Sequence, residues 1–176
     1  MTTPVSPQVG PEEATVLDDG RAITVRPVRD EDSDALRAMH RKLSARSVYQ
    51  RFFTALPELS EDRADRFTHV DGVDRVAFVA VNDAGELVGV GRYDRLPADR
   101  SQAEIAVIVL DDYQHHGLGT RLVRLLVEHG RTHGVQAFVA DVLMANQGMF
   151  HAFADAGLKA QASYDSGVAH LQMPLS

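Results

Sequence analysis

The sequence predicts a single domain of mixed α+β fold, and three observations along the chain lead to this prediction. Three helical patterns follow one another between residues 30 and 70. Two apolar runs are then joined by the turn "NDAG" at residues 82–85, which is typical of a β-hairpin. A strand–helix–strand–helix pattern and a final hairpin complete the chain up to residue 175. Helices and strands are therefore both abundant without alternating along the whole chain.

Composition limits the classes of function that the chain can have. Of its 176 residues, 44% are hydrophobic and 24% are charged, which is ordinary for one globular domain with its own core. The formal net charge of −7 argues against binding of nucleic-acid phosphates and favours cationic partners. Cysteine is absent, so the chain has no disulfide, no thiolate metal site and no cysteine nucleophile.

The N-terminal segment "MTTPVSPQVGPEEA" is polar and proline-bearing, and it lacks the apolar core of a signal peptide. The longest apolar runs, "VAFVAV" and "IAVIVL", are too short to span a bilayer. We therefore expect a soluble, cytoplasmic protein with no membrane partner. Within it, residues 1–20 should form a flexible tail and residues 21–176 a single domain.

The helices are expected from polar residues that precede amphipathic patterns. Asp30 can cap a first helix, and Ser44 and Ser60 can cap two short helices that follow it. A longer helix should run from about Gly119 to His133, where Gly134 ends it, and Asn146 should cap the last one. Seven β-branched or alternating runs predict strands at residues 21–28, 75–81, 86–96, 102–110, 135–143, 159–164 and 168–175.

The stretch "IVLDDYQHHGLGTRLVRLL", from Ile108 to Leu126, carries the first functional signal. It joins a strand to a helix through a loop with two glycines, Gly117 and Gly119. Free backbone N–H groups and the helix dipole make such a helix start an anion site, and each charge-assisted hydrogen bond contributes about 1.5–3 kcal/mol. Neither a nucleotide P-loop nor a dinucleotide-binding loop fits the spacing. A tight strand-to-helix turn without a ligand remains the alternative.

The segment "QHHGLGT" resembles the Q/R-x-x-G-x-G/A signature of the GNAT acetyltransferases. The resemblance covers nearly all of residues 21–174 and implies a mostly antiparallel, twisted sheet of six to seven strands with a V-shaped splay, flanked by helices. It also implies acetyl-CoA as co-substrate: the glycine loop would bind the pyrophosphate, Asn146 the pantetheine arm, and the strand backbone its amides. The cofactor-binding residues implied are Val107, Ile108, Val109, Gln114, His115, His116, Gly117, Leu118, Gly119, Thr120 and Asn146.

Two histidines depart from the Arg or Gly that is common in this signature. Neutral imidazoles of His115 and His116 can still donate to a phosphate, although backbone amides alone can also do so. His129 and His133 have the spacing of metal ligands on a helix, but no third ligand is evident. We therefore expect those two on the helix surface and no metal in the protein.

Two further segments, "LSARSVYQRFF" and "AEIAVIV", resemble the GNAT domain of bacterial protein lysine acetyltransferases, which modify acyl-CoA synthetases. The resemblance implies a protein lysine as acceptor, with an acyl-CoA synthetase as a candidate partner. Two other hypotheses stay open: a GNAT enzyme that acetylates a small amine, and a catalytically silent acyl-CoA-binding sensor.

Transfer of an acetyl group to lysine needs a base, because only about one lysine in a thousand is neutral at pH 7.4, a deficit of about 4 kcal/mol. Glu104 is the candidate: it is a carboxylate in an otherwise apolar strand, and it stands at the position of the proposed base in the resembled enzymes. We expect it to be partly buried. The alternative is a glutamate on the solvent-exposed face of the strand.

The group that protonates the departing thiolate is less evident. Many relatives place a tyrosine seven residues after the asparagine, but this chain has Phe153 there. Water, Tyr93 or Tyr113 are the substitutes that the sequence offers, and a thiol with a pKa of about 8.5 can also leave as thiolate.

Overall fold

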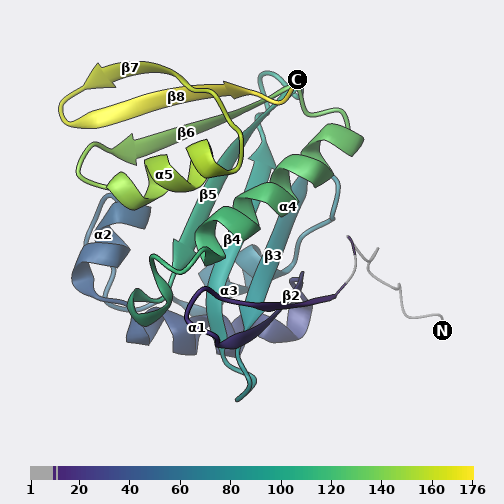
Figure 1. Cartoon of the computed structure of the whole chain (residues 1–176), viewed down its shortest axis with the longest axis vertical. Coiled ribbons are helices and arrows are strands. Elements are labelled where there is room, and N and C mark those ends of the chain that lie inside the picture. The colour runs from purple at the N-terminus through teal and green to yellow at the C-terminus, as the bar shows by residue number, and fades with distance from the viewer. Residues whose placement is uncertain (1–9, 11) are drawn as a thin grey trace.

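The computed structural model describes residue 10 and residues 12–176. Eight strands form one sheet in the order β1-β2-β3-β4-β5-β6-β8-β7, and every neighbouring pair is antiparallel except β5 and β6. Helices flank both faces of this sheet (Figure 1). The mixed, mostly antiparallel architecture predicted from the sequence is therefore confirmed. Within the described residues no helix is both long enough and apolar enough to cross a membrane.

Part of the N-terminal segment that was expected to be a flexible tail forms an edge strand of the sheet. Residues Glu13–Val16 form β1, which pairs with β2 at Ala22–Pro27, so the sheet has one strand more than expected. Leu17 follows β1 and is 6% exposed, so its burial stabilises this segment against the sheet. The strand is too short to show a clear pattern in the sequence. The expectation of a tail up to residue 20 is wrong for residues 13–20. Residues 1–9 and 11 lie outside the described residues.

Three helices cover one face of the sheet: α1 at Ser33–Lys42, α2 at Ala45–Phe52 and α3 at Glu61–Thr68. The serine caps of α2 and α3 are confirmed, because each hydroxyl accepts a hydrogen bond from the third residue of its helix. The cap expected at Asp30 is wrong. Residues Asp30–Asp32 form a 3₁₀ turn, and the Asp32 carboxylate accepts from the Arg29 amide and pairs with Arg26.

The centre of the sheet consists of β3 at Arg75–Val81, β4 at Leu87–Arg95 and β5 at Gln102–Val109. The helix α4, Leu118–Thr132, crosses the opposite face of these strands (Figure 1). Gly91 in β4 permits this close approach, because a Cβ there would lie 3.1 Å from the Cβ of Leu122.

The C-terminal part of the sheet separates from the centre. The strand β6, Ala137–Leu143, pairs in parallel with β5 only up to Glu104 and Val139. Beyond that point the two strands diverge, which confirms the V-shaped splay (Figure 1). Two further strands continue the sheet beyond β6: β8 at Val168–Pro174 and then β7 at Gln161–Asp165. The helix α5, Gln147–Asp155, covers this part of the sheet.

Candidate active site

The glycine loop turns sharply between β5 and α4. His115 has φ +64° and Gly117 has φ +89°, so both residues adopt the left-handed conformation, which glycine reaches without strain. Gly117 is the N-cap of α4, whose first amides have no partner inside the helix. A Cβ at Gly119 would make only an ordinary contact, 3.8 Å from the Cβ of Ala152. Packing of the chain therefore does not require glycine at 119, and its absent side chain leaves the helix start accessible.

The polar side chains of this loop contact the protein itself. The amide of Gln114 donates to the hydroxyl of Ser47 at 3.1 Å and to the carbonyl of Val109 at 3.0 Å. His116 Nε2 lies 3.7 Å from a carboxylate oxygen of Asp19. Gln114 therefore holds the loop to α2 and to the end of β5, and in this arrangement the loop presents mainly backbone amides.

The remaining expected residues occupy different positions around the same splay. The Leu118 side chain is 1% exposed, so it belongs to the core, and Thr120 lies in the first turn of α4. The His115 ring lies against α5, with Cε1 3.7 Å from the position of a Cβ on Gly148. The edge of β5 that carries Val107, Ile108 and Val109 continues beyond the point where β6 departs.

Asp111 ties the glycine loop to α2, a role that was not apparent from the sequence. Its carboxylate accepts from the hydroxyls of Ser44, at 2.7 Å, and Ser47, at 3.1 Å. Burial opposes the charged form, but these hydrogen bonds outweigh it and lower the pKa of Asp111. The serines of "LSARS" thus connect a helix near residue 45 to the start of the loop. The sequence indicated this contact only through the helical spacing of Ser44 and Ser47.

Asn146 caps α5 as expected, since its side-chain oxygen accepts from the amide of Met149 at 3.2 Å. Phe153 is 3% exposed and packs in the core. The Tyr93 hydroxyl lies 2.7 Å from Nδ1 of His129, and burial raises the pKa of Tyr93 to about 12. The Tyr113 hydroxyl accepts from Asn82 at 3.3 Å. Both tyrosines are therefore engaged away from the splay.

His129 is not the surface residue that the sequence suggested. Its ring faces Tyr93 and stacks on His133 with the centroids 3.8 Å apart. Burial and the neighbouring His133 lower the pKa of His129 to about 4, so its imidazole is neutral at physiological pH. Among residue 10 and residues 12–176, no three histidine, aspartate or glutamate side chains are grouped as metal ligands.

Glu104 lies where the two halves of the sheet separate. Its register partners are Asp94 in β4 and Val139 in β6. Its side chain is exposed rather than partly buried. Glu104 is one of the residues that line an open pocket of ≈ 470 Å³ over one face of β5, β6, β8 and β7. The expected burial is thus wrong, although the residue does face a cavity.

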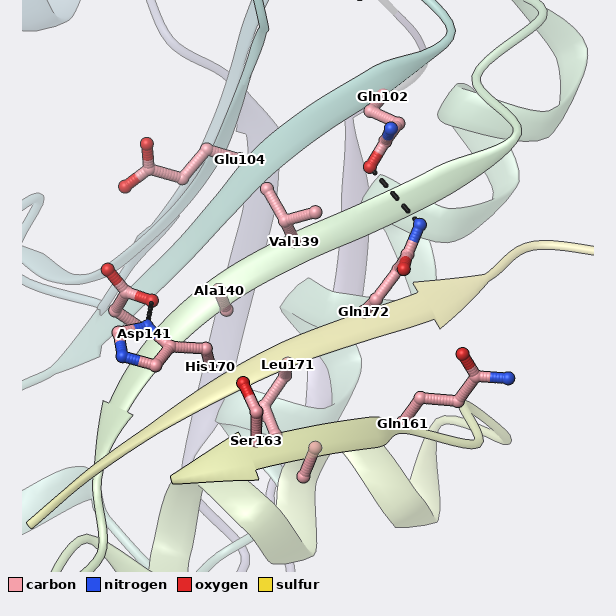
Figure 2. A pocket seen from close by; sticks show the side chains of 11 residues that line it. Gln102, Glu104, Val139, Ala140, Asp141, Gln161, Ser163, His170, Leu171 and Gln172 are labelled. Atoms are coloured by element: carbon pink, nitrogen blue, oxygen red, sulfur yellow. Dashed lines mark hydrogen bonds and ion pairs between the residues drawn. The ribbon is translucent and has the colours of Figure 1, made fainter. Parts of the chain in front are cut away.

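The pocket beside Glu104 is polar and also contains one pair of ionisable side chains. Asp141 Oδ1 lies 2.5 Å from Nδ1 of His170 on the neighbouring strand. Figure 2 shows these two side chains and Glu104 along one side of the pocket, with Gln161 and Gln172 opposite. Asp141 and His170 were missed in the sequence, where they resemble ordinary solvent-facing positions of alternating strands. Two carboxylates and several amides suit a cationic ligand.

Comparisons with known proteins agree with this geometry. The chain matches the Acetyltransferase (GNAT) family over residues 39–158. It is 36% identical to acetyltransferase PA5475 of Pseudomonas aeruginosa over 136 residues, which is 76% of this chain and 73% of that protein.

Two solved structures show the same fold. The GNAT domain of S. lividans PAT superposes with a TM-score of 0.83 at 37% identity, over 93% of this chain and 96% of that one. A phosphinothricin acetyltransferase from Sinorhizobium meliloti, solved in complex with acetyl-CoA, superposes with a TM-score of 0.71 at 20% identity, over 88% and 89% of the chains. With its glycine loop, splayed sheet and family match, the chain belongs to the GNAT family of acetyltransferases.

Proposed function

We propose that this protein transfers the acetyl group of acetyl-CoA to the side-chain amine of a protein lysine, with Glu104 as the general base. The observation that carries the proposal is the position of Glu104. Its carboxylate faces a polar pocket at the point where β5 and β6 separate, on a strand that leads directly to the glycine loop.

The residues around the splay fit the co-substrate. The first amides of α4 would hold the pyrophosphate, helped by the conformation of Gly117 and the missing side chain of Gly119. The edge of β5 around Val107 is free of β6 and would pair with the pantetheine amides. The Val109 carbonyl would not take part in this pairing, because it already accepts a hydrogen bond from Gln114. Asn146 uses its oxygen as a cap, which leaves its NH₂ group to donate. When bound, acetyl-CoA supplies an activated thioester.

Glu104 removes the proton that makes the acceptor ammonium unreactive, either directly or through one water. Deprotonation offsets a deficit of about 4 kcal/mol at neutral pH. The amine nitrogen then forms a bond with the acetyl carbon, and the carbon–sulfur bond breaks. With Phe153 buried and both tyrosines engaged elsewhere, the sulfur leaves as thiolate or takes a proton from water.

Two features support a protein lysine as acceptor. The pocket is open and carries the carboxylates of Glu104 and Asp141, which suit a cationic side chain presented from outside. The segments "LSARSVYQRFF" and "AEIAVIV", together with the likeness to the GNAT domain of S. lividans PAT, favour a protein such as an acyl-CoA synthetase. Such an acceptor would place the reaction in the cytoplasm.

A small cationic amine is the second candidate. The acidic, open pocket would also accept a polyamine or an amino acid, and the phosphinothricin acetyltransferase shares the fold. A silent acyl-CoA-binding sensor is the third possibility, for which Phe153 is the sole support.

The test incubates purified acyl-CoA synthetases with acetyl-CoA and this protein, with the wild type beside Glu104→Gln. We expect mass spectrometry to find a lysine that carries one acetyl group, and much less of it with the variant. Coenzyme A release with small amines, but no modified lysine, would favour the second candidate. Binding of acetyl-CoA without transfer to either acceptor would identify a sensor.

A further inference from the structure

A cluster of charged side chains lies beside Glu104 on the same face of the sheet. Asp94 and Glu104 are register partners in β4 and β5, so their carboxylates project side by side. Two arginines neutralise Asp94: Arg92 Nη2 at 3.1 Å and Arg75 Nε at 3.3 Å. No corresponding ion pair is formed by Glu104 in the part of the chain that the structure describes. Asp94 is therefore already compensated, and Glu104 is the carboxylate of this pair that lacks a cation among the described residues.

Arg51 of α2 is a cation on the same side of the sheet. It lines a small cavity of ≈ 40 Å³ between α2 and the sheet, together with Arg92, Ala106 and Ile108. Ala106 is the register partner of Arg92 and the next residue after Glu104 on this face of β5. Arg51 therefore lies over the face of β5 that carries both Ala106 and Glu104.

The charge of Arg51 is otherwise little compensated. In the described residues its close partner is the ring of Phe52, with the centroid 4.8 Å from the guanidinium carbon. Burial and repulsion by Arg92 lower the pKa of Arg51 to about 10, while the carboxylates of Glu104 and Asp94 act in the opposite direction. The guanidinium thus stays charged at neutral pH, half-buried, with Glu104 as the nearby carboxylate that has no cation of its own.

We propose that Arg51 is a positioning residue that acts through Glu104: its guanidinium attracts the Glu104 carboxylate and so holds that carboxylate at the edge of the acceptor pocket. This inference rests on the proposed function, because Glu104 must be the base for its position to matter.

A double-mutant cycle tests this coupling, with the variants Arg51→Met, Glu104→Gln and the double variant. The readout is kcat and KM for acetyl-CoA, with the acceptor that the wild type acetylates. Arg51→Met should lower kcat about tenfold while KM changes less than about twofold, because the cofactor contacts are elsewhere. In the Glu104→Gln background the same substitution should have no further effect on kcat. Arg51→Lys should recover at least half of the lost kcat, since it keeps the charge.

Arg46→Met is the matched control, because Arg46 is an exposed arginine of the same helix and should leave kcat unchanged. If Arg51→Met does not fold, as judged by thermal melting, Arg51→Gln replaces it in the cycle. An equal loss in both backgrounds, or Arg51→Lys as slow as Arg51→Met, would overturn the positioning role. Full activity of Glu104→Gln, or no transfer to any acceptor, would instead overturn the proposed function and this inference with it.

Discussion

Acidification should destabilise this protein through one partly buried imidazole, that of His129. His129 donates to or accepts from the Tyr93 hydroxyl on the face of the sheet that α4 covers, and burial lowers its pKa to about 4 from an unfolded value near 6.5. A group with a lowered folded-state pKa that is neutral when deprotonated binds its proton more readily in the unfolded chain. Its contribution to stability is therefore complete above pH 6.5 and is lost as the pH falls toward 4.

The magnitude follows from the two pKa values. Between pH 7.5 and pH 5 the unfolded chain takes up a proton at this site and the folded chain almost none. The free energy of unfolding should thus fall by about 2 kcal/mol from His129 alone, because each pKa unit corresponds to about 1.4 kcal/mol. Such a loss would lower the melting temperature of a domain of this size by about 4–8 °C.

Urea denaturation at pH 7.5 and pH 5 measures this loss. The wild type is compared with His129→Leu, which cannot titrate, and with His133→Gln, which keeps His129 but removes its stacking partner. His129→Leu should be less stable at pH 7.5 but should lose about 2 kcal/mol less than the wild type on acidification. The same loss in wild type and His129→Leu would show that another group governs the acid sensitivity.

Three substitutions test the cofactor side of the splay. Gly117→Ala forces a side chain into φ +89°, at a cost of about 1–2 kcal/mol, and should raise KM for acetyl-CoA about tenfold. Asn146→Ala removes the cap of α5 and should lower stability by about 1 kcal/mol, measured by urea denaturation, and also raise KM. Asp18→Asn removes a carboxylate that lies 3.6 Å from the Cβ position of Gly117, so KM should fall about twofold.

Each of these three substitutions can contradict the proposed role of its residue in cofactor binding. An unchanged KM in Gly117→Ala would mean that the glycine loop does not bind the cofactor. Loss of stability in Asn146→Ala without a change in KM would leave it as a helix cap only. A higher KM in Asp18→Asn would mean that the carboxylate supports the loop rather than repelling the pyrophosphate.

Local features of the site were predictable from the sequence. Ser44, Ser60 and Asn146 cap their helices as expected, because a cap depends on residues within one turn of it. The glycine loop was recognisable for the same reason, since its conformation is set by neighbouring residues. Strong apolar alternation also indicated the seven strands that were expected.

Long-range contacts were not predictable. Asp111 bonds to Ser44 and Ser47, which lie more than 60 residues earlier in the chain. The inward rotation of His129 depends on a tyrosine in a different strand, and the Asp141–His170 pair depends on the register of β6 and β8. The exposure of Glu104 follows from where β5 and β6 part, which no local pattern specifies.

A crystal structure of the protein with acetyl-CoA would show where the co-substrate binds. We predict the pyrophosphate at the first turn of α4 and the pantetheine arm in the splay between β5 and β6. We also predict the Glu104 carboxylate within about 6 Å of the thioester carbon, a distance that one bridging water or the amine itself can span. A cofactor bound outside the splay, or a thioester on the face of the sheet that α4 covers, would contradict these predictions.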